Sequence, residues 1–287
     1  MAPRAISPLR TADLGERLSR LARDFPCASA DIGDGQVSYR TCGSGPVLVL
    51  LHGIGSGAAS WMDCALTLAA QHRVVAWDAP GYGASTRLPQ ESPLASDYAE
   101  RLWRLLAALN VKSCVLVGHS LGALMAAAYA VRYGATVEKL VLLSPAQGYG
   151  SEAKKAEGAK VVRDRLAVLA ELGIDGMAAK RAERLVSERA GEAARAWVRW
   201  NMEQLHAQGY TQAVRLLCGD AIEKYRPPVP ASIYCGDADP VTTPAASKVL
   251  AEQWGVPYGM IESSGHACHV ERPEAVAALL IREMEAR

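Results

Sequence analysis

The pentapeptide GHSLG at residues 118–122 stands between two segments of different character. The apolar run 113–117 before it is typical of a buried strand, and the alanine-rich stretch after it, which runs to Tyr133, is typical of a helix. A serine on so tight a strand-to-helix turn needs a strained backbone and neighbours without Cβ atoms, which the two glycines provide. This context predicts a nucleophile elbow that exposes the Ser120 hydroxyl at the end of a strand.

Short apolar or alternating runs recur along the chain and predict the strands of one sheet. They lie at 28–32, 37–41, 47–51, 73–77, 113–117, 139–143 and 231–235, with a further short strand near 258–261. From residue 47 onward these runs alternate with helical stretches, the last two near 243–254 and from Pro273 to the end. The runs at 47–51 and 139–143 are solidly apolar, as strands of a parallel sheet covered on both faces should be. The core is therefore predicted to be an α/β sheet.

The sequence changes character between residues 146 and 228, where Ala, Glu, Lys and Arg dominate, helical periodicity persists and no convincing strand pattern appears. We interpret this stretch as a helical insertion. The chain then divides into an N-terminal helical extension at 1–30, a first core part at 31–145, the insertion at 146–228 and a second core part at 229–287. We expect the amphipathic segment near 12–24 to pack on the chain's own core, with a partner copy in a homodimer as the alternative.

Composition limits the partners and the compartment of the chain. Its 287 residues, half of them hydrophobic, can bury a substantial core. With 31 basic and 30 acidic residues, nothing electrostatic favours nucleic acid or an anionic membrane, so we expect a small-molecule partner. The N-terminus lacks an apolar h-region and no stretch reaches about 18 apolar residues, so neither secretion nor membrane insertion is indicated. Seven dispersed cysteines indicate reduced thiols and a cytoplasmic location.

A serine hydroxyl becomes a useful nucleophile when an imidazole accepts its proton and a carboxylate fixes the tautomer of that imidazole. Both groups occur downstream, each just past a predicted strand. His266 ends the tripeptide SGH at 264–266, and Asp239 lies in GDADP at 236–240, where Asp237 is an alternative acid two residues away. The order serine, aspartate, histidine is the one expected when an elbow of this kind carries the serine.

With these residues the chain resembles the α/β-hydrolase fold superfamily, from about residue 31 to the C-terminus. Four separated motifs carry the resemblance: LHGIG at 51–55, DAPGYGAS at 78–85, the elbow, and GH at 265–266 followed by ERPE at 271–274. The resemblance implies a mostly parallel sheet flanked by helices, with residues 146–228 as a cap over the active site. The segment 1–27 has no clear place in the family pattern.

The resemblance also implies a catalytic triad of Ser120, Asp239 and His266. It favours Asp239 over Asp237, because Gly-x-x-Asp resembles the family pattern there. Some relatives hold the acid just after the strand that corresponds to 139–143, but this chain has Ser-Pro at 144–145. That departure strengthens the assignment of Asp239.

A tetrahedral oxyanion needs two preorganised backbone N–H donors. One is expected at Leu121, immediately after the serine at the start of a helix, where the helix dipole also favours negative charge. The family pattern places the other at Ile54, in the loop after the strand 47–51. By the same resemblance, His52 supports this loop and is not the catalytic base.

Serine with histidine and aspartate favours acyl transfer to water from an ester, thioester, lactone or amide. The elbow, the segment 239–244 and a helical cap are similar to carboxylesterases and enol-lactone hydrolases, so hydrolysis of a small carboxylic ester or lactone is our leading hypothesis. The loop 52–58 with Trp61 also resembles carbon–carbon bond hydrolases of ring-cleavage products, although Ser56 replaces their proline and Ala267 their usual tryptophan. A slow-turnover ligand receptor on the same fold is a third hypothesis.

No metal or organic cofactor is expected. His266 and His269 have His-x-x-His spacing, but no acidic or cysteine cluster accompanies them. The loop 53–58 also matches a dinucleotide-binding pattern, which leaves the elbow unexplained.

The predicted cap offers candidate substrate-binding residues. Trp197, Trp200 and Met202 fall at helical spacing on a mostly apolar face, and the inner face of a cap lines the pocket. Lys154 and Lys155 are interpreted as solvated surface.

Overall fold

The computed structural model describes residues 8–285 and contains one eight-stranded sheet. Its strands are β1 (Cys27–Asp31), β2 (Gln36–Cys42), β3 (Val47–Leu51), β4 (Arg73–Trp77), β5 (Cys114–His119), β6 (Val137–Leu143), β7 (Ala231–Gly236) and β8 (Tyr258–Ile261). The order across the sheet is β1-β2-β4-β3-β5-β6-β7-β8, antiparallel from β1 to β4 and parallel from there to β8. Every predicted strand is confirmed to within two residues at either end.

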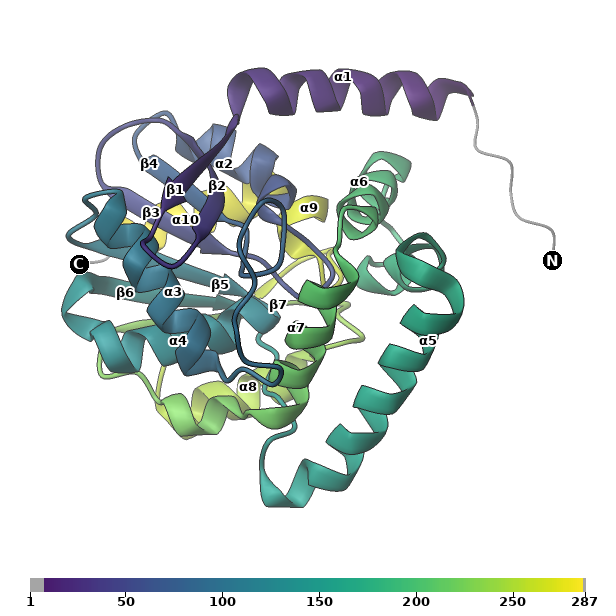
Figure 1. Ribbon diagram of the computed structural model, residues 1–287. Coiled ribbons are helices and arrows are strands. Elements are labelled where there is room, and N and C mark those ends of the chain that lie inside the picture. Colours follow the sequence, from purple (N-terminus) through teal and green to yellow (C-terminus); the bar gives the residue numbers. More distant parts are fainter. Residues whose placement is uncertain (1–7, 286–287) are drawn as a thin grey trace.

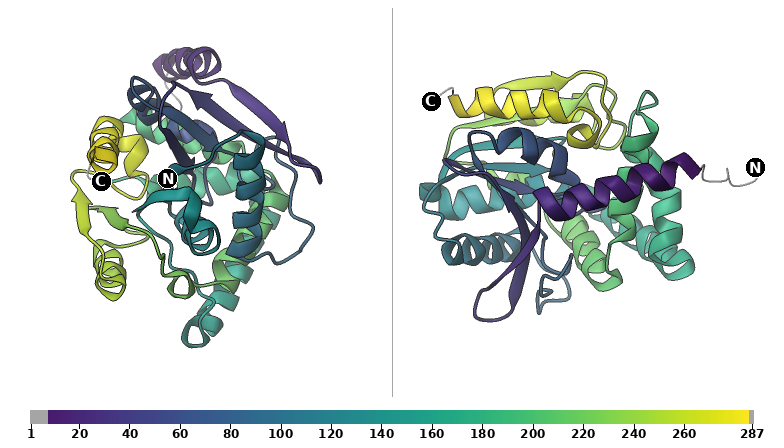
Figure 2. Two further views of the ribbon diagram at one scale, coloured as in Figure 1. Left: turned by 90° about the vertical axis from the view of Figure 1, so that its left-hand side faces the viewer. Right: turned by 90° about the horizontal axis from the view of Figure 1, so that it is seen from above.

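The solidly apolar strands are buried because helices cover both faces of the sheet, as Figures 1 and 2 show. Along β3, Val49 and Leu51 join one core cluster, whereas Leu48 and Leu50 join the other. The first cluster includes side chains of α3 (Ala95–Ala108), α4 (Leu121–Tyr133) and α8 (Pro244–Trp254). The second includes side chains of α2 (Met62–Leu68) and α10 (Pro273–Glu285). Alternate residues of one strand therefore face two hydrophobic layers, which removes the polar positions that a one-sided strand would show.

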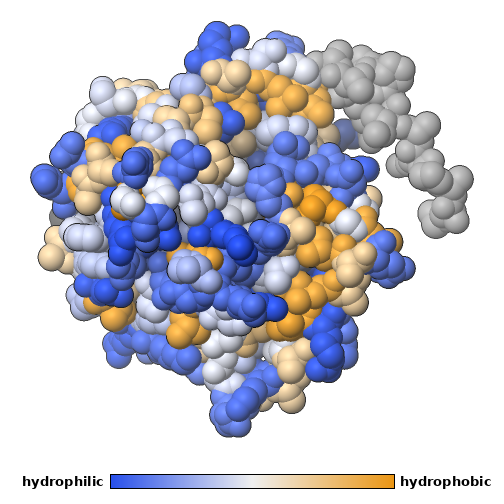
Figure 3. All heavy atoms as spheres, viewed as in Figure 1, coloured by the Kyte–Doolittle hydropathy of each residue, from blue (hydrophilic) through white to orange (hydrophobic). Residues whose placement is uncertain are grey.

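The chain between β6 and β7 forms helices and loops. They are η3 (Glu152–Lys154), α5 (Lys155–Arg181), η4 (Ala182–Leu185), α6 (Glu192–Glu203), α7 (Ala207–Gly219) and η5 (Ile222–Tyr225). We call this group the inserted helices. They lie together at one side of the sheet (Figure 1), and hydrophobic side chains gather over α5 to α7, with a second hydrophobic group at the top of the view over α1 (Figure 3).

The N-terminal helix α1 (Pro8–Asp24) packs against its own chain, as expected from its amphipathic sequence. Leu21 is buried, and Arg17 pairs with Asp63 of α2. The Arg17 guanidinium also lies 4.5 Å from the ring centroid of Trp197, so α1 bridges the core and the inserted helices. Among residues 8–285, every helix is too short or too polar to cross a membrane.

Candidate active site

The elbow places a strained serine between β5 and α4. Ser120 has φ 54° and ψ −119°, which is an uncommon conformation for a residue with a side chain. Its neighbours must be glycine for lack of space: a Cβ on Gly118 would lie 2.5 Å from the carbonyl oxygen of Gly122, and one on Gly122 would lie 2.6 Å from that of His52. The two glycines thus bring the turn against the loop after β3, and the Ser120 hydroxyl faces the cavity beside it.

A chain of hydrogen bonds links three predicted site residues. His266 Nε2 lies 2.9 Å from Ser120 Oγ, and His266 Nδ1 lies 2.9 Å from Asp239 Oδ2. The three side chains come from loops after β5, β7 and β8, at the carboxyl edge of the parallel strands. With Nδ1–H donating to the carboxylate, the lone pair of Nε2 faces the serine hydroxyl. The arrangement can therefore move the hydroxyl proton onto the imidazole.

Asp239 is held as an anion although it is buried. Burial acts to raise its pKa, but the hydrogen bond and charge of His266 and two backbone N–H groups hold that pKa below its ordinary value of 3.8. The backbone donors are Val241 at 2.7 Å and Thr242 at 3.0 Å, both to Oδ1. The Thr242 hydroxyl adds a bond of 2.8 Å to Oδ2. With the Cys235 thiol at 3.7 Å from Oδ2 as a weak fifth donor, the carboxylate is oriented firmly toward His266.

The alternative acid, Asp237, points elsewhere. It is exposed and accepts a hydrogen bond of 3.0 Å from the backbone N–H of Ser264. The structure thus brings Asp239 to the histidine and gives Asp237 a part in shaping the loop before His266.

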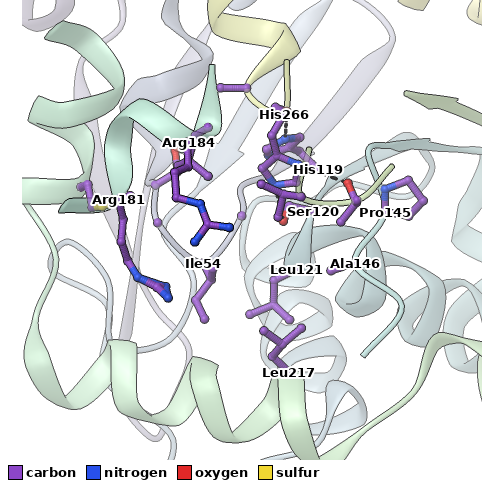
Figure 4. A pocket seen from close by; sticks show the side chains of 18 of the residues that line it. Ile54, His119, Ser120, Leu121, Pro145, Ala146, Arg181, Arg184, Leu217 and His266 are labelled. Carbon is purple, nitrogen blue, oxygen red and sulfur yellow. Dashed lines mark hydrogen bonds between the residues drawn. The ribbon is translucent and has the colours of Figure 1, made fainter. Parts of the chain in front are cut away.

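Ile54 and Leu121, the predicted oxyanion donors, line the same cavity as Ser120 and His266 (Figure 4). The loop that carries Ile54 is tied to the 78–85 motif by several bonds. His52 Nε2 accepts from Ala79 N at 3.0 Å, which leaves Nδ1–H to donate to the Gly53 carbonyl at 2.8 Å. The Tyr82 hydroxyl donates to the Ile54 carbonyl at 2.9 Å. His52 therefore supports the loop, as the sequence analysis expected.

Two further histidines, His119 and His269, are buried beside His266. His119 Nε2 donates to the carbonyl of His266 at 2.7 Å, and His269 Nε2 lies 3.2 Å from Ser60 Oγ. Within residues 8–285, no group of three or more His, Cys, Asp or Glu side chains is arranged to hold a metal ion. Both imidazoles line the same cavity as Ser120, and burial favours their neutral form.

The buried histidines make the fold sensitive to acid. Burial lowers the pKa of His119 from 6.5 to about 3, and it lowers that of His269 well below 6.5. At a pH between the ordinary histidine pKa of 6.5 and the lowered pKa of His119, the unfolded chain binds more protons than the folded one. The free energy of unfolding therefore falls as the pH falls. We expect the melting temperature to drop between about pH 7 and about pH 4, and to drop less in His119→Gln, whose amide can still donate to His266.

The control for this measurement is His206→Gln, because His206 is exposed. Its melting temperature should follow the wild-type slope in a thermal unfolding series over the same pH range. Equal slopes for wild type and His119→Gln would show that His119 is not a source of the acid sensitivity.

The site opens into a cavity of about 410 Å³ between the sheet and the inserted helices. Much of its wall is apolar. The apolar wall includes Ile54, Leu121, Met177, Leu185, Val198, Met202 and Leu217. A small molecule with an apolar body fits such a lining.

Of the three predicted cap residues, one lies on the wall of this cavity. Met202 lines it, together with Val198 one turn earlier on α6. Trp197 and Trp200 do not: Trp197 is fully buried, and its ring stacks on Trp200 at 4.7 Å while Arg17 of α1 covers it. The expectation of substrate contact at these two tryptophans is therefore wrong, because they occupy the face of α6 that packs on α1 and the core.

Three arginines in the cavity were missed. Arg165 and Arg181 of α5 and Arg184 of η4 line it, and Lys154, expected to be solvated surface, is exposed but also lines it. In the sequence these residues stand among many other charged residues of a helical stretch. No spacing signal distinguishes the ones that face inward.

Comparison with known proteins gives a family for most of the chain. A family model described as the alpha/beta hydrolase family matches residues 48–279. Among solved structures, the enol-lactonase from Burkholderia xenovorans superposes with a TM-score of 0.77 at 22% identity, covering 90% of this chain and 100% of that one. At this identity the likeness concerns the fold.

Two curated relatives match in different ways. An uncharacterized protein of Mycobacterium tuberculosis is 35% identical over 107 residues, which are 37% of this chain and 31% of the relative. The match thus spans about a third of that relative's length. A relative from Shigella flexneri that carries the name carbamate hydrolase RutD is 28% identical over 261 residues, which cover 82% of this chain and 90% of RutD.

Proposed function

Since the chain belongs to the alpha/beta hydrolase family, we propose that it is a serine hydrolase that cleaves a carboxylic ester or lactone of a small molecule through an acyl-enzyme. The observation that carries this proposal is the distance of 2.9 Å from His266 Nε2 to Ser120 Oγ, continued to Asp239 on the other side of the ring. A serine paired in this way is the nucleophile of acyl transfer.

In the proposed reaction Ser120 Oγ attacks the carbonyl carbon of the substrate while its proton passes to His266 Nε2. Asp239 stabilises the imidazolium that forms. The negative oxygen of the tetrahedral intermediate accepts hydrogen bonds from the backbone N–H groups of Ile54 and Leu121. His266 then donates its proton to the leaving oxygen, and a water activated by the same imidazole hydrolyses the acyl-enzyme.

The inserted helices act as the cap in this proposal. They supply Met177, Val198 and Met202 to the apolar wall, which supports an acyl or alcohol group of mainly hydrocarbon character. The relation to RutD, which extends over most of both chains, favours carbamates as a second class of substrate.

The proposal is tested by multiple-turnover hydrolysis of p-nitrophenyl acetate. We expect steady release of nitrophenolate well beyond one equivalent per enzyme. A single stoichiometric burst would instead indicate an acylated receptor that turns over slowly. Faster turnover of a p-nitrophenyl carbamate than of the acetate would favour the second class.

A further inference from the structure

The arginines of the inserted helices form a positively charged region of the cavity wall. Arg165, Arg181 and Arg184 all line the cavity that contains Ser120 and His266. In Figure 4 the side chains of Arg181 and Arg184 extend into the open space on the side away from Pro145 and Ala146. We call these three residues the arginine cluster.

The cluster lacks a matching carboxylate. None of the ion pairs among residues 8–285 includes any of its members, although other arginines and lysines nearby are paired, such as Lys160 with Asp164. The hydrogen-bond partner of Arg165 is the neutral hydroxyl of Tyr210, at 3.2 Å. Glu157 lines the cavity as well, but it is exposed on the first turn of α5.

Like charges close together and partly out of water repel one another. Burial lowers the pKa of Arg181, and the charges of Arg165 and, less strongly, Arg184 act in the same direction, whereas Tyr210 acts against them. Arg165 and Arg181 are half-buried, and Arg184 is exposed at the edge of the cavity. Such an arrangement is costly in the free protein unless an anion completes it. Guanidinium groups present planar pairs of donors that match an oxyanion such as a carboxylate.

The backbone fixes this cluster relative to the candidate catalytic histidine. The carbonyl of Leu185, next to Arg184, accepts the N–H of Ala267, next to His266, at 2.7 Å. Two residues further on, the hydroxyl of Ser187 donates to Glu271 at 2.7 Å. The end of η4 is therefore bound to the loop of the imidazole, so the backbone beside Arg184 keeps a set position relative to His266.

We propose that the cavity takes a substrate whose acyl group carries a carboxylate at the end remote from the scissile carbonyl, bound by Arg181 and Arg184 with Arg165 beside them. The apolar wall contacts the hydrocarbon between the two ends. This inference rests on the proposed function, because it assigns a substrate class to the same site.

The test compares two esters that differ in one charge: mono-4-nitrophenyl adipate and its methyl ester. We expect wild type to show a kcat/KM at least about tenfold higher for the anionic ester. In R181Q/R184Q the ratio of the two kcat/KM values should fall about 10- to 100-fold, and in R181K/R184K it should fall less, because the charge remains. Raising NaCl from about 0.05 M to about 0.5 M should lower the wild-type ratio.

The control is R163Q, which makes one Arg→Gln change at an exposed position on α5 outside the cavity lining. Its ratio should equal that of wild type, and thermal unfolding of each variant reports whether it is folded. Adipate should compete with the anionic ester more strongly than inorganic phosphate does, and the reverse order would overturn the choice of a carboxylate.

A wrong carboxylate site and a wrong proposed function would give different results in this experiment. If both esters are hydrolysed in a Ser120-dependent manner and R181Q/R184Q leaves their ratio unchanged, the carboxylate site is wrong while the proposed function stands. If neither ester is hydrolysed in a Ser120-dependent manner, the proposed function itself is wrong.

Discussion

Replacing Ser120 with alanine is expected to lower kcat for p-nitrophenyl esters by at least about 10⁴-fold. The variant keeps the imidazole, the carboxylate and the backbone donors but has no atom that can form the acyl-enzyme. The change removes a single oxygen atom and keeps the Cβ of residue 120, so the fold should be retained. The measurement is steady-state release of nitrophenolate, with the intact mass of the protein recorded after mixing with ester.

Ser56→Ala is the control for this experiment, because Ser56 is a second hydroxyl on the lining of the same cavity. Its rate should stay within about tenfold of wild type. Wild type should show a mass increase equal to the acyl group, whereas Ser120→Ala should show none. An acylated Ser120→Ala protein would mean that another residue is the nucleophile.

Asp239→Asn is expected to lower kcat by about 10³- to 10⁴-fold, whereas Asp237→Asn should lower it by less than about tenfold. The amide of asparagine cannot hold the His266 tautomer whose Nε2 accepts the serine proton, and it cannot stabilise the imidazolium. Thr242 Oγ1 lies 3.2 Å from His266 Nδ1 and can keep the ring in place, so the expected loss is one of charge and tautomer more than of position.

The two aspartate variants form their own matched pair, because they make the same chemical change two residues apart in one loop. Rates on p-nitrophenyl acetate are compared after thermal unfolding has shown both variants to be folded. A larger loss in Asp237→Asn than in Asp239→Asn would reverse the assignment of the acid.

The central strands of the sheet could be predicted from the sequence because they are buried on both faces. The run 47–51 has side chains in both core clusters, so all of its residues are apolar, and this continuous apolar pattern predicts a strand covered on both faces. The elbow could also be predicted from the sequence, because steric crowding leaves no room for a side chain at positions 118 and 122. Where the backbone has no space for a Cβ atom, only glycine fits, and such a glycine can be recognised in the sequence.

The inner surface of the inserted helices could not be predicted in the same way. Whether Val198 or Trp197 faces the cavity depends on a rotation of about 100° about the axis of α6, and both are apolar. In the fold, Arg17 of α1 packs on the ring of Trp197, so this side of α6 faces α1 and Val198 faces the cavity. The arginine cluster was hidden for a similar reason, because a charged residue that faces a cavity and one that faces solvent read alike in a charged helix.

The carboxylate of Glu271 has a consequence for how molecules enter and leave the site. It accepts the backbone N–H of Gly265 at 2.8 Å and that of Ser187 at 3.0 Å. One side chain thus binds both the segment after η4, which belongs to the inserted helices, and the loop that carries His266. A movement of the inserted helices at Ser187 would therefore also pull His266 away from Ser120. Entry of substrate and release of product should therefore leave this end of the inserted helices in place, so that the base stays beside the serine throughout turnover.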